Sequence, residues 1–219
     1  MKISKNTVEV LKNFSQINPN ILVKAGQEIR TINSGKSAFA KAKIEENFDK
    51  EFAIYDLNEL LAVLSLGDNP EVNFNDDHMA ISVQNFGEIN FFYSKPELVT
   101  SPPDKDLPSS EGFFTYSLTE GSLQFWLRTA ATIAAPYVSI VADGTQAKVS
   151  ITDPEMKNAT KFETVIGQTD KTFKAHIPTA NIKLMPQDYT VNIPSTGGFV
   201  HFKASNVEYW IALDKSSEF

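Results

Sequence analysis

Two short motifs in this chain of 219 residues contain side chains that could bind phosphate or metal. Gly35-Lys36-Ser37 has the letters that end a phosphate-binding loop, but that loop needs a glycine five residues earlier, where Arg30 stands. Asp76-Asp77-His78 offers metal-ligand side chains, yet no second ligand pair follows at a useful spacing. We therefore predict a strand-joining turn at the first motif, a solvated hairpin tip at the second, and no metal site.

The residues needed for nucleophilic catalysis do not form a recognisable group. His78, His176 and His201 are scattered along the chain, and neither a serine elbow nor a cysteine accompanies them. Asn158-Ala159-Thr160 is a glycosylation sequon, but we recognise no signal peptide that would deliver it to a glycosylating compartment. These patterns favour a protein that is not an enzyme and uses no cofactor.

The composition limits the class of protein. Hydrophobic residues make up 42% of the chain, enough for two modest cores, and no apolar run is long enough to predict a membrane span. The absence of cysteine fits a reducing compartment such as the cytoplasm. The formal net charge of −7 argues against tight electrostatic binding of nucleic acid. The excess of acid lies mainly in residues 1–111, which carry 11 Lys or Arg and 17 Asp or Glu.

One structural plan occurs twice in the sequence. Residues 52–67 and 173–190 each contain a strand end, a polar helix cap, a short amphipathic helix and a turn into another strand. Phe173 follows Phe52 by 121 residues, about half of the chain. We therefore predict a duplicated sheet-and-helix fold of the α+β class, whose shape rather than a catalytic cluster carries the function.

Four helices and fourteen strands follow from the periodicity and the turn residues. Helices are expected near residues 4–16 and 119–133, and shorter ones after Asp56 and after Thr179, with polar caps at their starts. Strands are expected near residues 21–32, 38–46, 48–55, 70–76, 79–85, 88–94, 113–118, 137–142, 146–152, 161–167, 171–177, 188–193, 198–204 and 207–213.

A proline-rich stretch divides the chain. Residues 95–111 hold four prolines and alternating charges, which is typical of an extended surface connector. We therefore expect a first domain over residues 1–94, the connector over 95–111 and a second domain over 112–219.

Five blocks of this sequence resemble the sliding clamps of T-even-type bacteriophages, in matching order. They include MKISKNTVEVLKNFSQIN and AIYDLNELLAVLSL, and they span residues 1–18, 53–66, 123–128, 180–191 and 202–219. The resemblance implies a DNA-clamp (PCNA-like) fold with two similar domains per subunit, each with antiparallel sheets outside and two helices inside, assembling as a homotrimeric ring. Such a ring encircles double-stranded DNA, tethers the phage DNA polymerase, is opened and closed by a clamp-loader ATPase, and hydrolyses nothing itself.

The resemblance also assigns expected roles to particular residues. Five cations on or beside the polar helix faces are expected to meet DNA phosphates without reading sequence: Lys2, Lys5, Lys12, Arg128 and Lys183. Apolar residues of the connector and of the last strand are expected to bind hydrophobic partner tails: Leu98, Val99, Leu107, Tyr209, Trp210, Ala212 and Leu213. Edge strands are expected to join neighbouring subunits.

Other interpretations stay open at this point. A β-rich structural or adaptor protein of a virion would also suit the acidic charge and the strand content, and an enzyme with an unrecognised site is a third alternative. In the T-even phages the clamp also supports late-gene transcription. Late transcription factors are therefore further candidate partners of this chain. The place of action implied by the resemblance is the cytoplasm of the host cell.

Overall fold

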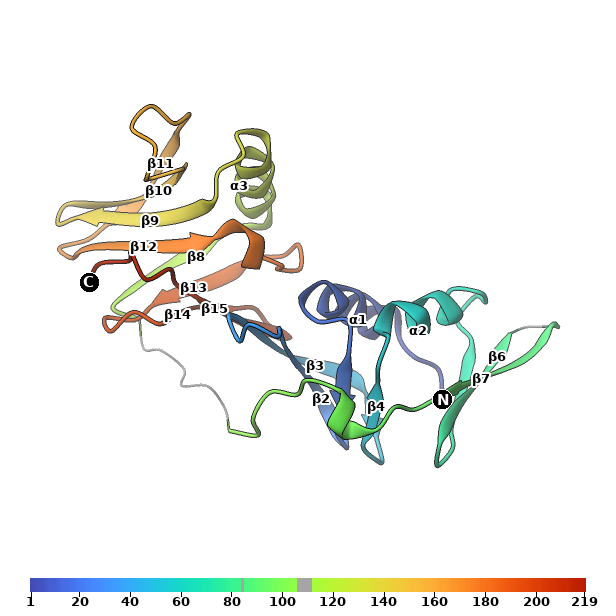
Figure 1. The fold of residues 1–219 in the computed structure, drawn as a ribbon. Coiled ribbons are helices and arrows are strands. Elements are labelled where there is room, and N and C mark those ends of the chain that lie inside the picture. The colour runs from blue at the N-terminus through green and yellow to red at the C-terminus, as the bar shows by residue number, and fades with distance from the viewer. Residues whose placement is uncertain (84, 106–111) are drawn as a thin grey trace. The chain divides into compact units, whose positions relative to one another are not determined.

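The computed structural model describes residues 1–83, 85–105 and 112–219, and the chain divides into two compact units, residues 1–104 and 105–219 (Figure 1). Residues 95–104, expected to belong to the connector, are part of unit 1 in this division. Within the described residues, no helix is both long and apolar enough to span a membrane.

Unit 1 combines two α-helices with short antiparallel strands. Its elements are α1 (Lys5–Ile17), β1 (Ile21–Val23), β2 (Gly26–Ile32), β3 (Ala38–Phe48), β4 (Phe52–Ile54), α2 (Leu57–Leu64), β5 (Glu71–Phe74), β6 (His78–Val83), β7 (Gly87–Phe92) and the 3-10 turn η1 (Pro96–Leu98). Strand β1 pairs with β4, β2 pairs with β3, and β5, β6 and β7 form a sheet in that order. The single strand expected over residues 21–32 is thus two strands. Gly26, at φ +118°, takes a backbone conformation that side-chain-bearing residues rarely adopt, and this turns the chain between them.

The two helices of unit 1 begin at the predicted caps and pack side by side (Figure 1). The Ser4 hydroxyl accepts a hydrogen bond from the Thr7 N–H at 3.2 Å. The Asp56 carboxylate accepts from the N–H groups of Asn58 and Glu59 at 3.0 and 3.1 Å. Because these bonds satisfy donors that a helix start leaves unpaired, the polar residues fix where each helix begins.

The apolar stripe of each helix is buried in the core of unit 1. On α1 these residues include Val10 and Phe14, and on α2 they are Leu57, Leu60 and Leu64. Full burial of one such side chain stabilises a fold by about 1.5–3 kcal/mol, so the stripes hold both helices against the strands. The polar face of each helix is left exposed.

Unit 2 repeats this arrangement with a single α-helix. Its elements are β8 (Phe114–Leu118), α3 (Glu120–Thr132), β9 (Tyr137–Asp143), β10 (Gln146–Thr152), β11 (Phe162–Gln168), β12 (Thr172–Pro178), the 3-10 turn η2 (Thr179–Asn181), β13 (Tyr189–Ile193), β14 (Phe199–Lys203) and β15 (Val207–Ala212). One sheet has the order β11-β10-β9-β12, and in unit 2 β15-β14-β13-β8 follow each other in antiparallel pairs. Helix α3 lies against β9 and β10, with Leu123, Trp126 and Ala130 buried.

The predicted duplication is confirmed in the order of the elements. In each unit a helix precedes four strands, then come the α-helix α2 in unit 1 or the 3-10 turn η2 in unit 2, and three strands follow. Phe52 and Phe173, the residues that align the two halves, are both buried in the corresponding strands β4 and β12. The bridge between Lys2 and Glu71 in unit 1 stands where β8 pairs with β13 in unit 2.

The fourth helix is a correction to the sequence analysis. After Thr179 the described chain forms only the three-residue turn η2, so unit 2 has one α-helix instead of two. The Thr179 hydroxyl donates to the Ala135 carbonyl at 3.0 Å and does not cap a helix. Ile182 and Leu184 are both buried, a spacing of two residues that suits an extended chain better than a helix.

Candidate nucleic-acid interface and connector

Helix α1 presents two of the expected cations to solvent. Lys5 and Lys12 are exposed on the face opposite the buried Val10 and Phe14. The Lys12 ammonium lies 3.6 Å from the Glu9 carboxylate, with the two side chains 64% and 61% exposed. A pair this exposed to water is weak, so Lys12 can exchange Glu9 for another anion.

A buried carboxylate that the sequence analysis did not single out holds the start of α1. Glu46 of β3 is only 8% exposed and accepts hydrogen bonds from the Ser4 N–H and the Thr7 hydroxyl. The strand alternation contained this signal, because Glu46 stands in phase with the buried Ile44 and Phe48. Glu46 therefore positions the helix that carries Lys5 and Lys12.

Helix α3 supplies the one arginine of the candidate set. Arg128 is exposed, and the start of its helix is held by the Thr119 hydroxyl and by Asp188, whose carboxylate accepts from the Glu120 N–H at 2.8 Å. Glu120 also accepts from the Gln124 amide at 2.8 Å on the polar face. The helix therefore offers a single positive charge to a ligand.

The remaining two candidates lie beside helical segments. Lys2 is exposed and lies just before α1, tied to Glu71 by a backbone bridge. Lys183 follows η2, is half-buried, and lies between the buried Ile182 and Leu184. Unit 1 thus carries Lys2, Lys5 and Lys12 on or next to one helix, and unit 2 carries Arg128 and Lys183 on separate segments.

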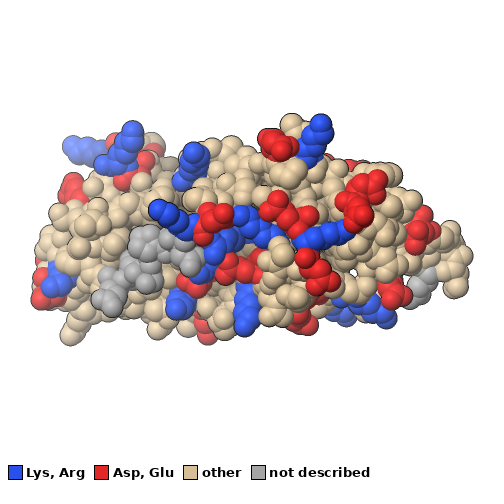
Figure 2. All heavy atoms as spheres, turned by 90° about the horizontal axis from the view of Figure 1, so that it is seen from below, with Lys and Arg blue, Asp and Glu red and all other residues tan. Residues whose placement is uncertain are grey.

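Charge elsewhere on the surface is mixed. On the face shown in Figure 2, Lys and Arg alternate with Asp and Glu. Interspersed charges of both signs largely cancel beyond about 10 Å at ordinary salt concentrations. This face therefore does not have the single-sign stripe that is typical of a protein that binds DNA by charge alone.

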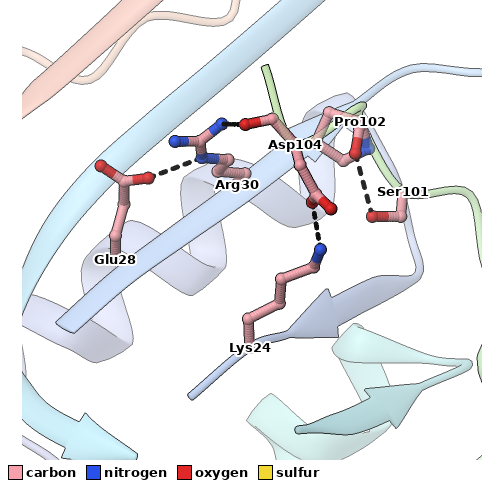
Figure 3. A network of polar contacts seen from close by, with 6 residues as sticks. All are labelled: Lys24, Glu28, Arg30, Ser101, Pro102 and Asp104. Atoms are coloured by element: carbon pink, nitrogen blue, oxygen red, sulfur yellow. Dashed lines mark hydrogen bonds and ion pairs between the residues drawn. The ribbon is translucent and has the colours of Figure 1, made fainter. Parts of the chain in front are cut away.

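The first part of the connector is fastened to unit 1 by polar contacts. Lys24 pairs with the Asp104 carboxylate, and Arg30 donates to the Asp104 carbonyl at 3.3 Å and to Glu28 at 2.5 Å (Figure 3). The Thr100 N–H also donates to the Asn20 side chain at 2.8 Å. The Lys24 ammonium, through its hydrogen bond and its charge, lowers the pKa of the Asp104 carboxyl below its ordinary value of 3.8.

A hollow of about 360 Å³ lies beside this fastening. Its lining combines residues of the first strands with residues of the connector: Leu22, Lys24, Ala25, Glu28, Arg30, Ser101, Pro102 and Asp104. Cations, carboxylates and a few apolar side chains therefore face a common space within unit 1 (Figure 3).

The structure separates the expected partner-binding residues into three groups. Leu98 is 60% exposed and Val99 is half-buried, whereas Leu107 lies outside the described residues. Tyr209 and Trp210 are only 2% and 4% exposed, because both belong to the core of unit 2. The expectation that their rings present surface to a partner is corrected accordingly.

Ala212 and Leu213 form the third group of expected partner-binding residues. Both are half-buried at the end of β15, where the Leu213 N–H donates to the Gly198 carbonyl at 2.8 Å. Part of each side chain therefore remains accessible to solvent.

The motifs set aside in the sequence have structural roles. Gly35-Lys36-Ser37 forms the turn between β2 and β3, where the Asn33 side chain accepts from the N–H groups of Ser37 and Ala38. At the start of β6, His78 contacts Asp77 at 2.6 Å. That hydrogen bond is the largest cause of the lowered pKa of the Asp77 carboxyl. In the part of the chain that the structure describes, no three His, Asp or Glu side chains gather as metal ligands would.

One serine–histidine contact has the chemical make-up of a nucleophile and its base. Ser139 Oγ and His176 Nδ1 are hydrogen-bonded at 2.7 Å. Both residues are buried, at 2% and 7% exposed, so a substrate could not reach the hydroxyl. The pair therefore stabilises the β9–β12 packing.

Comparison with protein families covers both units. Residues 3–93 match the family model described as DNA polymerase processivity factor, and residues 119–215 match the one described as gp45 sliding clamp, C terminal. The sliding clamp of Vibrio phage KVP40 is 33% identical over 220 residues, which cover 98% of this chain and 99% of that protein. The sliding clamp of Enterobacteria phage T4 is 28% identical over 227 residues, which cover 99% of this chain and 98% of that protein.

Solved structures confirm the predicted clamp fold at low sequence identity. The A. fulgidus PCNA, solved with the C-terminal region of FEN-1, has a TM-score of 0.73 and 13% identity, and the match covers 100% of both chains. The Helicobacter pylori beta clamp, bound to a DNA ligase peptide, has a TM-score of 0.72 and 12% identity over 98% of this chain and 65% of that one. The chain therefore belongs to the family of bacteriophage sliding clamps, the non-enzymatic accessory proteins that make DNA polymerase processive.

Proposed function

We propose that three copies of this chain close head to tail into a ring that encircles double-stranded DNA and tethers the phage DNA polymerase. The full-length match to phage sliding clamps is the observation that carries the proposal. The trimer, the loading of the ring by an ATP-dependent clamp loader, and action in the cytoplasm of the host cell are all part of it. This assignment favours the ring over the alternative of a virion protein.

Two sheet edges support a head-to-tail interface. Among the strands that the structure describes, β7 pairs only with β6, and β11 pairs only with β10. Both edges carry exposed apolar side chains, since Phe92 of β7 is 64% exposed and Val165 of β11 is 55% exposed. Phe125 of α3 contacts Phe162 of β11 at 5.3 Å between ring centroids and adds to the second edge. Two different edges of one chain suit an interface in which β11 of one copy extends the sheet that ends at β7 of the next.

Four exposed cations and the half-buried Lys183 support weak contact with the encircled duplex. We propose that Lys2, Lys5, Lys12, Arg128 and Lys183 face the DNA and meet its phosphates without reading bases. A net charge of −7 agrees with this arrangement, because a closed ring stays on DNA by topology and needs little electrostatic affinity. A few mobile contacts allow the ring to slide.

Partner tails are proposed to dock on apolar residues of the connector and, as a separate group, on those at the end of β15 in unit 2. The connector residues are Leu98, Val99 and Leu107, and those at the end of β15 are Ala212 and Leu213. The polymerase and the clamp loader are the expected partners of these two groups, and late transcription factors are proposed as further ones. The exposure of Leu98 and the partial exposure of Val99, Ala212 and Leu213 are the supporting observations, because apolar anchors dominate such contacts.

Leu98 permits a matched test of the docking surface. Leu98→Ala is expected to weaken binding of a peptide from the C-terminus of the cognate polymerase by roughly five- to tenfold, the effect of losing a few buried methylene contacts. Leu66→Ala is the control, because Leu66 is 61% exposed against 60% for Leu98 and lies outside the connector. If calorimetric titration gives the same affinity for both variants, Leu98 is not an anchor.

Extension of a primed circular template tests the function as a whole. With the cognate polymerase and clamp loader present, the protein is expected to convert short, distributive products into full-length strands. Product lengths that do not change when the protein is added would contradict the proposal.

A further inference from the structure

The outer edge of β12 is covered by residues 214–219, which follow β15 and which we call the edge strap. Lys174 and Glu218 form an antiparallel bridge in which each N–H donates to the carbonyl of the other at 2.8 Å. The His176 N–H donates to the Ser217 hydroxyl at 3.0 Å, and the Asp214 N–H donates to the His176 carbonyl at 2.8 Å. The strap thus extends the sheet β11-β10-β9-β12 by one short edge.

Side chains give this edge a chemical preference. The Lys174 ammonium lies 2.9 Å from the Glu218 carboxylate. The Phe219 ring lies parallel to the buried Phe173 ring, at 6.1 Å between centroids and 2° between planes. It also covers Gly197, where a Cβ atom would come within 3.1 Å of the ring. The edge therefore offers backbone groups for pairing, the Lys174 cation, and a place for an aromatic ring between Phe173 and Gly197, where a larger residue than glycine would crowd the ring.

Unit 1 covers the corresponding edge in the same way. Ser94, which follows β7, bridges Ala53 of β4, and its N–H donates to the Ala53 carbonyl at 2.8 Å. Tyr93 stacks on Phe52 at 5.3 Å, as Phe219 stacks on Phe173. Masking this sheet edge with an aromatic residue is therefore a repeated feature of the fold, consistent with the tendency of open edges to pair with other chains.

The strap is held by contacts that another peptide could replace. Its ion pair is exposed to water, since the Lys174 and Glu218 side chains are 50% and 66% exposed, and Phe219 is 43% exposed. Such a pair contributes little to stability. The backbone bonds of the edge are independent of sequence, so an extended segment of another protein can form them equally well.

We propose that the β12 edge is a peptide-binding site, which the edge strap fills within the chain and which a partner protein fills by displacing the strap. The partner segment is extended and carries an acidic residue followed directly by an aromatic one. The carboxylate pairs with Lys174, and the ring stacks on Phe173 over Gly197. This site lies within unit 2 and depends neither on ring closure nor on DNA.

Hydrogen exchange on the full chain tests whether the strap opens. The Lys174 and His176 N–H groups point to the strap, whereas the alternation of an antiparallel strand directs the Ala175 N–H to β9. In a Phe219→Ala variant, exchange at Lys174 and His176 is expected to accelerate roughly tenfold, with exchange at Ala175 unchanged. Equal acceleration at all three amides, or at none, contradicts a strap that opens on its own.

Peptide binding tests the site directly. The probe is a fluorescent peptide with the sequence of residues 213–219, Leu-Asp-Lys-Ser-Ser-Glu-Phe, titrated into the wild type and the Phe219→Ala variant. Because the peptide binds only chains whose edge is open, the variant is expected to bind about fivefold tighter or more. Equal affinities, or no binding to the variant, overturn the proposal.

Reversing the charge of residue 174 tests whether Lys174 selects an acidic residue in the bound peptide. Lys174→Glu is expected to reverse the preference between the probe and a second peptide that carries Lys in place of Glu. The ratio of the two affinities within one variant does not depend on how often the strap opens. Lys203→Glu is the control, since Lys203 is exposed on β14, and it is expected to keep the wild-type ratio. An unchanged ratio in Lys174→Glu overturns the assignment.

A second copy of the chain is the competing occupant. If the Lys174→Glu and Glu218→Lys variants associate when mixed, beyond the association of either variant alone, the edge takes the strap of another copy. Sedimentation velocity of the mixture distinguishes this case, and such association would contradict a site for partner proteins.

Discussion

Glu46 is the residue on which the placement of α1 depends most. Replacing it with Ala leaves the Ser4 N–H and the Thr7 hydroxyl without their buried acceptor. We expect Glu46→Ala to lower the free energy of unfolding by about 1–3 kcal/mol, the cost of unsatisfied buried donors. Urea denaturation followed by circular dichroism measures the change.

The neighbouring Glu45 is a matched control for this prediction. Glu45 is exposed on the opposite face of β3, so Glu45→Ala is expected to change the stability by less than about 0.5 kcal/mol. Equal losses in the two variants would show that the charge of β3, and not the contact with α1, is responsible.

His176 makes the stability of unit 2 depend on pH. Burial lowers the pKa of its imidazole below the ordinary 6.5, and Lys174 lowers it further, while Asp214 and Glu218 oppose the shift. The unfolded chain therefore takes up a proton at a higher pH than the folded chain. The contribution of neutral His176 to the free energy of unfolding is expected to be fully present above about pH 6.5. It is expected to be lost as the pH falls from about 6.5 to the pKa of His176 in the folded chain.

Urea midpoints measured across this range check the pH dependence. His176→Asn, which keeps a polar group near Ser139 but cannot titrate, is expected to flatten the curve below about pH 6.5, whatever its effect on stability at neutral pH. A slope identical to that of the wild type would assign the dependence to other groups.

At the scale of single residues, the sequence predicts helix caps better than contacts between residues that are distant in the sequence. Ser4, Asp56 and Thr119 were expected at helix starts and are found there, because a cap depends on residues within one turn. By contrast, Glu46 contacts Ser4, 42 positions away, and the strap residue Glu218 contacts Lys174, 44 positions away. A local pattern contains no information on such partners. The burial of Tyr209 and Trp210 was missed for the same reason.

At the scale of elements, α1 is the helix that carries two of the cations proposed to face the duplex. Lys5→Glu with Lys12→Glu is expected to shorten polymerase products on a long primed template several-fold, because two weak phosphate contacts become repulsive. Both side chains are exposed, so assembly and fold are expected to stay intact.

The control variant makes the same change of charge at two lysines outside the helices. Lys157→Glu with Lys203→Glu alters two exposed lysines outside the helices and is expected to leave the product length unchanged. Equal losses in the two double variants would indicate an effect of net charge alone and would remove Lys5 and Lys12 from the DNA-facing set.

Edge strand β11 and the neighbouring α3 carry the proposed subunit contact. Phe125 is 47% exposed, and burying a charge in its place at an interface opposes association. Phe125→Glu is expected to raise the concentration for half-assembly about tenfold or more, as measured by light scattering.

Met156 is the matched control for Phe125. It is 62% exposed between β10 and β11 and does not belong to either edge strand, so Met156→Glu is expected to assemble like the wild type. Equal assembly of the two variants would place the interface elsewhere.

The order of elements could be predicted from sequence almost throughout, because hairpin turns and alternation are local. The exceptions are informative. The helix expected after Thr179 is the turn η2, since Ile182 and Leu184 must both be buried two residues apart. The strand expected over 21–32 is divided at Gly26. After Thr179 the requirements of packing override local propensity, whereas at Gly26 a backbone conformation that favours glycine divides the strand.

At the scale of the whole molecule, the proposed function depends on the closure of a ring around DNA. The family follows from similarity along nearly the whole chain. A net charge of −7 does not contradict DNA binding by a ring of the proposed kind, because a closed ring needs little electrostatic affinity to stay on DNA. Retention on DNA is therefore expected to depend on whether the DNA has ends.

Retention on circular and linear DNA measures this property most directly. Labelled protein is loaded onto nicked circular duplex by its clamp loader, the DNA is cut once with a restriction enzyme, and bound protein is followed by gel filtration in high salt. We predict stable retention on the circle and rapid loss after the cut. Equal retention before and after cutting, or loss from the uncut circle as salt is raised, would contradict a closed ring around DNA.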